Sequence, residues 1–506
     1  MPKKALITNL WLLTRTGSEL HVLEVARALV RRGWEVTCYA LLVGEPLLSR
    51  LEALGEAVHV VELGHEELLD DHYDLLYAQH HVVSDFVFGN LGITFDHVIV
   101  SILSSMDVAE LVPELAPHSD RILFVSEEAL EAARNDLRAL ETCPPVSIFP
   151  NYASRDYFDA FDARTKPATE APRRVAVISN HVPEEVRGLA DEVPSGVSVD
   201  YFGMQTRSVD VTPELLASYD VVVTIGRTVQ QCMACGTPVF CYDHFGGPGY
   251  LYAEELDAHA AANFSGRSDP RRRSAKELAA ELMGGFARAV SQRGVLLAYA
   301  HEHFDFDVLL DEGLGDVMAR PAPARPLPAP RSRREKMRML VGYMRDVIDL
   351  NAYGAAQVFY GTGPGDIAQE RSFYVRYQYG EEVSVSLSRI PEPYRAVRFD
   401  PDDLACVCQP ITEGLVPLRP CRQTDEGMLF LVDDPFFEVD EEAAATGRID
   451  FVARPVPRGE LLERLARNVE SAGEKNAGTV GDAEAKAGPK SGPLGRLRRV
   501  LSRSGH

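Results

Sequence analysis

Residues 219–249, YDVVVTIGRTVQQCMACGTPVFCYDHFGGPG, decide the fold of this chain. Asp220–Ile225 is a short run rich in valine, which is typical of a strand buried on both faces of a parallel sheet. A helix is expected after Gly226 and ends at Gly236, and Val239–Tyr242 is the next buried strand. The stretch therefore predicts a complete βαβ unit.

The start of this helix is expected to attract an anion. Thr228 and Gln231 have the spacing of a capping box, in which two side chains satisfy free backbone N–H groups. The remaining N–H groups and the helix dipole both favour negative charge at a helix start that follows a strand. Arg227 is the only basic side chain at this start; the alternative interpretation is an ordinary surface arginine.

Residues 226–239, GRTVQQCMACGTPV, resemble the donor-sugar segment of GT-B glycosyltransferases, especially family 4, and Met233–Val239 match it closely. The family carries two carboxylates separated by seven residues, and Val223 and Gln231 stand at those positions here. In the family the second carboxylate accepts hydrogen bonds from both ribose hydroxyls. Gln231 offers one acceptor and one donor group, so it would hold a ribose with one hydroxyl turned round, or serve only in the capping box.

A second segment with the same resemblance lies near the N-terminus. After a predicted strand at Ala5–Leu10, residues 16–40, TGSELHVLEVARALVRRGWEVTCYA, contain a capping box at Thr16 and Glu19 and a helix closed by Gly33. The segment resembles the opening of family 4 enzymes, where a glycine loop lets the donor's sugar and phosphates approach closely. The resemblance implies this role for Gly17, which stands alone where the family usually has two glycines.

Two histidines are catalytic candidates. The predicted strand Asp74–Ala78 ends at Gln79, His80 and His81, and the family places a histidine at this rim of its cleft. His80 or His81 would then bind an acceptor hydroxyl or a sugar. The alternative is a structural cap at the end of the strand.

The second domain is expected to begin after a linker at residues 159–172. Its first strand, Arg174–Ser179, leads to Asn180, and a later strand leads to Gly203; the resemblance implies that both residues face the donor. The family usually holds the diphosphate with an Arg and a Lys near this point, and neither occurs at the expected place. By analogy Arg227, with the N–H groups of Thr228 and Val229, would hold the diphosphate. Residues 243–249 are expected to form a flexible loop, and residues 275–318 a helical tail that packs back across the cleft between the domains.

The C-terminal third has a different pattern. A proline-rich spacer at Arg320–Arg331 and a helix at Lys336–Ile348 precede short alternating segments that predict an all-β sandwich. The strands are expected at 373–379, 383–387, 396–400, 405–409, 428–432 and 449–453. We expect the sandwich to be an accessory module that positions the acceptor or mediates oligomerisation, without a catalytic role.

Composition limits the class of protein. A net charge of −23 argues against nucleic acid as a partner, because phosphate binding needs a basic face. No run of about 18 apolar residues occurs, so no segment is expected to span a membrane. Cys232 and Cys235 lie on one short helix, and no second pair completes a zinc site, so no metal is expected. The eight cysteines favour reduced core thiols in a cytoplasmic protein.

The last residues form a basic tail. Residues 470–493 have almost no large apolar groups and are expected to be disordered. Leu494, Leu497 and Leu501 then recur at helical spacing among arginines. Such a helix could make peripheral contact with the anionic inner face of a membrane, and the alternative is a solvated tail.

Together these patterns predict an α/β fold class with two Rossmann-like domains, the GT-B architecture, followed by an all-β sandwich. The expected ranges are 1–158 and 159–330 for the Rossmann-like domains, 331–369 for a helical connector, 370–457 for the sandwich and 458–506 for a helix and basic tail. The resemblance implies transfer of a sugar from a nucleotide-sugar donor to a glycan or lipid-linked acceptor. It also implies a retaining, metal-independent reaction in which the nucleotide sugar is a substrate and no cofactor is needed. The alternative is a catalytically reduced GT-B protein that binds a glycan or nucleotide sugar for a partner transferase.

Overall fold

The quoted stretch folds as the predicted βαβ unit. The computed structural model describes residues 2–162, 171–203, 209–322, 352–363, 366–391, 394, 396–402, 404–431 and 435–456. Strand β10 (Val221–Thr224), helix α10 (Arg227–Cys235) and strand β11 (Val239–Asp243) follow one another, and the two strands pair in parallel. Gly236 ends the helix in the left-handed conformation, with φ of 65°.

The capping box predicted at Thr228 and Gln231 is wrong. Gly226 is the N-cap residue, with φ of 63°, and no side chain caps the helix. A positive φ costs glycine little, so the chain turns directly from the strand into the helix. Thr228 and Gln231 therefore lie inside α10.

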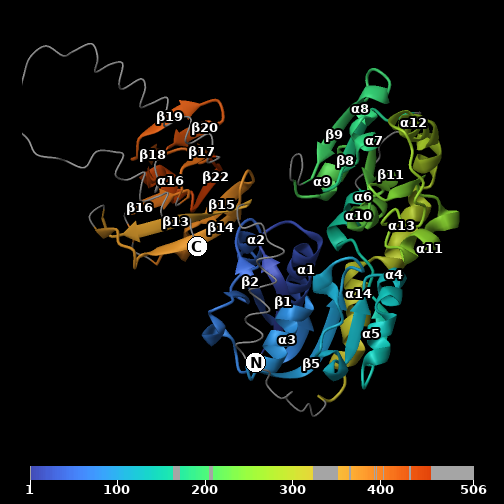
Figure 1. Ribbon diagram of the computed structural model, residues 1–506, viewed down its shortest axis with the longest axis horizontal. Helices are drawn as coiled ribbons and strands as arrows, with labels where there is room; N and C mark the ends of the chain where they lie inside the picture. Colours follow the sequence, from blue (N-terminus) through green and yellow to red (C-terminus); the bar gives the residue numbers. More distant parts are fainter. Residues whose placement is uncertain are drawn as a thin grey trace, which may run out of the picture. The chain divides into compact units, whose positions relative to one another are not determined.

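The N-terminal Rossmann half, defined by β1–β7, contains a seven-stranded parallel sheet with the order β3-β2-β1-β4-β5-β6-β7. Figure 1 labels β1, β2 and β5 of this sheet. Central strand β1 is buried on both sides, because its alternate side chains enter two different hydrophobic cores. The strands are β1 (Lys4–Leu12), β2 (Glu35–Val43), β3 (Val58–Glu62), β4 (His72–Ala78), β5 (Thr94–Ile102), β6 (Arg121–Phe124) and β7 (Val146–Ile148).

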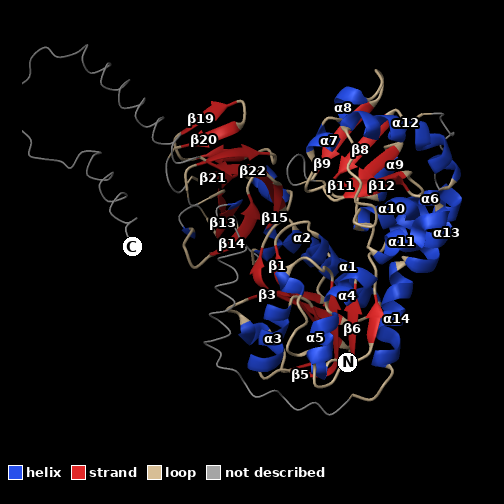
Figure 2. Cartoon of the chain, turned by 45° about the vertical axis from the view of Figure 1, so that its right-hand side comes forward, coloured by secondary structure: helices blue, strands red, loops and turns tan. Residues whose placement is uncertain are grey.

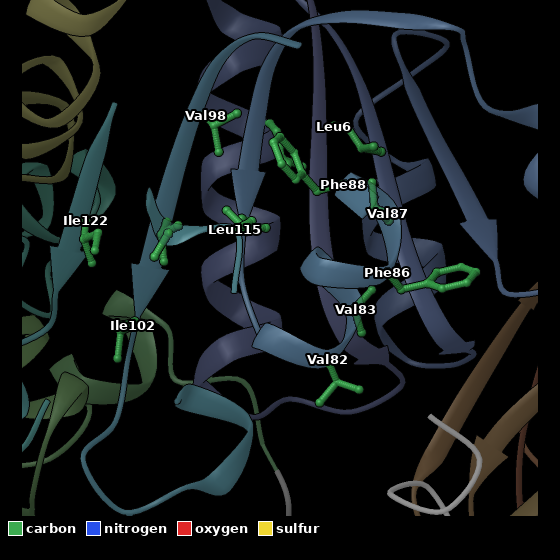
Figure 3. Close-up of a cluster of buried hydrophobic side chains, with 14 of the residues drawn as sticks. Leu6, Val82, Val83, Phe86, Val87, Phe88, Val98, Ile102, Leu115 and Ile122 are labelled. Atoms are coloured by element: carbon green, nitrogen blue, oxygen red, sulfur yellow. The ribbon is translucent and has the colours of Figure 1, made fainter. Parts of the chain in front are cut away.

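Helices cover both faces of this sheet. One core contains α1 (Gly17–Arg31), α2 (Leu47–Glu52) and α14 (Phe306–Met318), and the other contains α3 (His81–Asn90), α4 (Glu127–Ala132) and α5 (Arg134–Ala139). Figure 3 shows Val83, Phe86 and Val87 of α3 in the second core, together with Leu6 of β1. The capping box predicted at Thr16 and Glu19 is confirmed: the Thr16 N–H donates to Glu19 Oε2 at 3.2 Å.

The second Rossmann half, defined by β8–β12, has the strand order β12-β11-β10-β8-β9. Figure 2 shows these strands flanked by helices. Besides β10 and β11, its strands are β8 (Arg174–Ile178), β9 (Ser198–Phe202) and β12 (Gly246–Tyr250). Its helices besides α10 are α6 (Arg155–Asp162), α7 (Glu184–Arg187), α8 (Leu189–Glu192), α9 (Pro213–Ala217), α11 (Leu256–Ala261), α12 (Ala275–Ser291) and α13 (Arg293–His303).

The flexible loop predicted at residues 243–249 is wrong, because β12 occupies most of it and pairs antiparallel with β11. A side chain at Gly247 would overlap the carbonyl oxygen of Cys241, so this glycine permits close strand contact.

The predicted linker also begins too early. Tyr157 and Phe158 of α6 are buried in the core of the second half, and the expected boundary between residues 158 and 159 falls inside this helix. Residues 163–170 of the expected linker lie outside the described residues.

The predicted helical tail is confirmed as α12, α13 and α14. Phe306, Leu310 and Leu314 of α14 are buried in the core of the N-terminal half, so the chain returns to it after completing the second half.

The β region, residues 352–456, contains two five-stranded antiparallel sheets with one shared core. The first sheet has the order β14-β13-β16-β21-β18 and the second β15-β22-β17-β20-β19. Its elements are β13 (Tyr353–Gly361), β14 (Ser372–Gln378), β15 (Glu382–Ser386), β16 (Ala396–Asp400), β17 (Cys406–Pro410), β18 (Leu415–Pro417), β19 (Cys421–Thr424), β20 (Gly427–Phe430), β21 (Phe437–Val439), α16 (Glu441–Ala445) and β22 (Arg448–Pro455).

All six predicted strands of this region are present, and the predicted fold class is confirmed in its elements. The connector predicted as helical over residues 331–369 is wrong at its end, because β13 lies there and its buried Ala356 and Val358 belong to the shared core. The predicted helix at residues 336–348, most of the proline-rich spacer and the C-terminal tail lie outside the described residues.

Candidate functional site

A cleft of about 480 Å³ lies at the carboxyl ends of strands from both Rossmann halves. Ile178 and Thr224, at the ends of β8 and β10, line it from the second half, and the loop after β1 lines it from the N-terminal half. In each sheet the strand order reverses beside these strands, between β1 and β4 and between β8 and β10. Open α/β sheets bind their ligands at such reversals, so the topology marks this cleft as the candidate site.

Six of the eight residues predicted to bind a donor line the cleft: Gly17, Asn180, Gly203, Arg227, Thr228 and Gln231. Gly17 faces open space, since a side chain built there would meet no atom within 4 Å. The fold itself requires glycine at position 203, because the φ of Gly203 is 142° and a side chain would overlap the carbonyl oxygen of Ser179.

Gly226 and Val229 do not line the cleft. The Val229 N–H donates to the Gly226 carbonyl at 2.9 Å, and the Val229 side chain is fully buried. The Gly226 N–H donates to the Phe264 carbonyl oxygen at 2.9 Å. Because both N–H groups are already used inside the fold, the prediction that the Val229 N–H binds a diphosphate is wrong.

Arg227 has unmet hydrogen-bonding capacity. Its Nε and Nη1 atoms are buried without a hydrogen-bond partner, and only 16% of its side chain is exposed. The nearest paired carboxylate oxygen, on Glu24, is 4.0 Å from Nη2. Leaving a buried donor unsatisfied costs about 1–3 kcal/mol, and more for a charged group, so an anion bound at Arg227 would recover this free energy.

The guanidinium of Arg227 packs against an aromatic network. Its guanidinium lies 4.9 Å from the ring centre of Tyr152, and the Tyr152 hydroxyl is 3.0 Å from His21 Nδ1. The other ring nitrogen of His21, Nε2, is 2.8 Å from the Tyr77 hydroxyl. Burial, together with the charge of Arg227, lowers the pKa of His21 to about 3. A neutral imidazole therefore supports the tyrosine under Arg227.

Three further arginines, which the sequence did not single out, line the same cleft: Arg15, Arg27 and Arg50. Arg15 Nε and Arg50 Nη1 lie 3.3 and 2.9 Å from Asp210 Oδ1. Burial lowers the pKa of the Arg50 guanidinium and the charges of Arg15 and Arg27 lower it further, whereas Asp210 raises it. The arginines are paired with carboxylates of the same lining, since Arg15 also lies 3.1 Å from Glu381 and Arg27 lies 3.1 Å from Glu24.

The sequence pattern could have indicated part of the cleft lining. Gly17, Leu20, Glu24 and Arg27 recur at intervals of three and four residues, which places them on one face of α1, and all four line the cleft. Gln231 and Arg227 are likewise one turn apart on α10. Arg15 and Arg50 belong to no such pattern.

The two candidate catalytic histidines do not line the cleft. His80 is buried at the N-cap of α3, where its Nδ1 accepts from the Leu10 N–H at 2.8 Å and its Nε2 lies 3.3 Å from Glu110. These contacts give His80 a structural role, although its side chain makes no capping hydrogen bond to α3. His81 is the first residue of α3.

Two other histidines, both from the second half, line the cleft. His181 and His244 line the cleft after β8 and β11, with ring centres 5.3 Å apart. The buried Asp243 accepts from the Ser179 hydroxyl at 2.7 Å and lies 3.4 Å from His244 Nδ1. Among the described residues, no group of three or more His, Cys, Asp or Glu side chains could hold a metal ion.

No protein-family model matches the chain, and no curated protein matches it. Among solved structures, a glycosyltransferase from Rickettsia africae ESF-5 is 11% identical with a TM-score of 0.40, over 63% of this chain and 98% of that chain. WaaG, a glycosyltransferase involved in lipopolysaccharide biosynthesis, is 10% identical with a TM-score of 0.37, over 62% and 98%. An alpha-glucosyltransferase in complex with UDP and a 13-mer DNA is 14% identical with a TM-score of 0.40, over 63% and 100%. Likenesses this low carry no argument about the site, and its function is inferred from its own residues.

Proposed function

We propose that the chain is a glycosyltransferase that moves a sugar from a nucleotide-sugar donor to a glycan or lipid-linked acceptor. The observation that carries the proposal is Arg227, a cation with two buried and unsatisfied nitrogens at the start of α10, in a cleft between two Rossmann-like halves. A nucleotide sugar has a diphosphate between two larger groups, which matches a cationic centre inside an extended cleft.

The lining of the cleft contains side chains that fit the parts of such a donor. Ile178, Phe202, Val209 and Val211, all from the second half, supply apolar surface for a nucleoside. Gln231, buried on the same half, would face the ribose. Arg227 and the arginines of the N-terminal half would neutralise the diphosphate, as preorganised cations do for charge that develops on a leaving group.

The finer properties of the reaction are part of the proposal. Retention of anomeric configuration and independence of a metal rest on the resemblance of residues 226–239 to family 4. The unsatisfied nitrogens of Arg227 support metal independence, because this guanidinium could supply positive charge that a divalent ion would otherwise provide.

The proposed location is the cytoplasm, with peripheral contact at the inner face of the membrane through the C-terminal tail. All eight cysteines are free, which suits a reducing compartment. None of the described helices is long and apolar enough to cross a membrane.

A thermal-shift screen of UDP, GDP, ADP and dTDP with the full chain tests the proposal. A ligand at a hundred times its dissociation constant adds about 2.7 kcal/mol of stability, so binding should raise the midpoint clearly. Arg227→Ala should weaken binding by about 1.5–3 kcal/mol, the range for a hydrogen bond to a charged group. Arg187→Ala is the matched control, because Arg187 is an exposed arginine of the same half outside the cleft.

The outcomes separate the proposal from its alternative. Binding that depends on Arg227, together with slow hydrolysis of the matching nucleotide sugar, supports the transferase. Binding without hydrolysis or transfer points to the catalytically reduced protein. Absence of binding by all four nucleotides would contradict the proposed function.

A further inference from the structure

The β region is fastened to the N-terminal half through strand β14. The Glu45 N–H donates to the Arg376 carbonyl at 2.7 Å, and Glu45 forms a parallel β-bridge with Tyr377. The Arg376 side chain returns to the N-terminal half, with Nη1 donating to the Val43 carbonyl at 3.0 Å and to Glu62 at 2.9 Å. Backbone and side chain of Arg376 therefore fix the same strand.

Close packing at Gly44 makes this attachment specific. A side chain at Gly44 would overlap the carbonyl oxygen of Arg376 and come within 2.7 Å of Leu13 Cδ2. The neighbouring strand β15 is held as well, since the Ser49 hydroxyl donates to the Ser384 carbonyl at 3.0 Å. These contacts hold β14 and β15 against the N-terminal half, next to the cleft.

The turn between these two strands enters the cleft. Gly380, with φ of 80°, allows the turn, and Gln378 and Glu381 on either side of it both line the cavity. Glu381 Oε2 lies 3.1 Å from Arg15 Nη1, and the same guanidinium lies 3.3 Å from Asp210 through Nε. Arg15 thus contacts carboxylates from the second half and from the β region.

We infer that the turn Gln378–Glu381 is the sugar-binding wall of the cleft and recognises the hydroxyl groups of the donor's sugar; this rests on the proposed function. A phosphate on Arg15 would lie beside Glu381, because both would be ligands of one planar guanidinium. The sugar attached to that phosphate is then within reach of the turn. A carboxylate accepts from two hydroxyls and an amide both donates and accepts, which suits a polyhydroxylated ring.

The inference gives the β region a binding role, because two of its side chains form part of the cleft lining.

The test compares the affinities of the full chain for UDP, GDP, ADP and dTDP with those for UDP-glucose, GDP-mannose, ADP-glucose and dTDP-glucose, by titration calorimetry. The variants are Glu381→Gln and Gln378→Ala, and Glu382→Gln is the control, since Glu382 is the neighbouring exposed carboxylate. Take the nucleoside diphosphate and the matching nucleotide sugar that the wild type binds. Glu381→Gln should weaken the affinity for the nucleotide sugar about ten-fold or more, and should change the affinity for the nucleoside diphosphate less than about three-fold.

The sign of this effect separates recognition of the sugar from simple electrostatics. Removing the negative charge of Glu381 cannot weaken the binding of an anion through electrostatic repulsion. A selective loss of affinity for the nucleotide sugar therefore requires lost contacts to the sugar. Equal changes in the affinities for the nucleotide sugar and the nucleoside diphosphate, or an effect no larger than that of Glu382→Gln, would overturn the inference and leave the proposed function intact. A wild type that binds neither class of ligand would overturn both.

Discussion

Replacing His21 by glutamine is expected to remove a large part of the acid sensitivity of the N-terminal half. His21 is fully enclosed between the hydroxyls of Tyr77 and Tyr152, and burial, with the added charge of Arg227, lowers its pKa to about 3. In the unfolded chain a histidine has a pKa of about 6.5. Glutamine keeps one donor and one acceptor for the two hydroxyls but does not titrate.

The sign and size of the effect follow from the two pKa values. Because the folded pKa is lower than the unfolded one, the unfolded chain takes up the proton first, and acid favours unfolding. The contribution of His21 is complete above about pH 6.5 and is lost as the pH falls towards 3. The full difference, at 1.36 kcal/mol for each pKa unit, is about 5 kcal/mol, of which about 2 kcal/mol is lost by pH 5.

The assay is urea unfolding followed by tryptophan fluorescence at pH 7.5 and pH 5. The chain has two tryptophans, and both lie in the N-terminal half, Trp11 on β1 and Trp34 just before β2. The wild type should lose about 2 kcal/mol more than His21→Gln between the two pH values. His65→Gln, at an exposed histidine of the same half, should retain the wild-type loss. Equal losses in the wild type and in His21→Gln would refute the reasoning.

Three further predictions concern the cleft and the attachment of the β region. Gln231→Glu should increase the preference for UDP over 2′-deoxy-UDP by about 1–3 kcal/mol, because a carboxylate can accept from both ribose hydroxyls; an unchanged ratio in calorimetry would remove residue 231 from the ribose site. Gly44→Ala should lower the unfolding free energy by about 1–3 kcal/mol through the overlap with Arg376, whereas Gly284→Ala, in open space on α12, should not destabilise; equal midpoints for both variants would argue against the attachment. Burial raises the pKa of the Glu45 carboxyl to about 7, so its contribution to stability is complete below about pH 4.5 and is lost as the pH rises through 7. Glu45→Gln should remove about 2.4 kcal/mol of this loss between pH 5 and pH 7.5 in the tryptophan assay, and an unchanged pH profile would count against it.

Local sequence patterns predicted the βαβ unit well, because its signals are local. A run of valines, a glycine in the left-handed conformation at 236 and Pro238 each act within a few residues of their own position. The capping box at Thr228 failed although its spacing was correct, since the backbone conformation of Gly226 starts the helix earlier. The flexible loop predicted at residues 243–249 was wrong for a related reason. Glycine permits flexibility and close packing alike, and Gly247 is needed for packing against Cys241.

The candidate site was predicted only where its residues lie on one short segment. Arg227 and Gln231 share α10, and Gly17 opens α1. Arg50, Asp210 and Glu381 meet around Arg15 from distant parts of the chain, and no spacing rule connects them. The prediction for His80 failed because a histidine after a buried strand has the same local pattern whether it bonds to a neighbouring strand or faces a ligand.

The central claim is that this cleft binds a nucleotide sugar and breaks its bond to the sugar. The most direct measurement is the release of nucleoside diphosphate from UDP-glucose, GDP-mannose, ADP-glucose and dTDP-glucose by the full chain, compared with Arg227→Ala and Arg187→Ala. We predict slow release from at least one donor by the wild type and Arg187→Ala, and strongly reduced release by Arg227→Ala. Release at the same rate by Arg227→Ala, or no release by the wild type from any of the four donors, would contradict the claim.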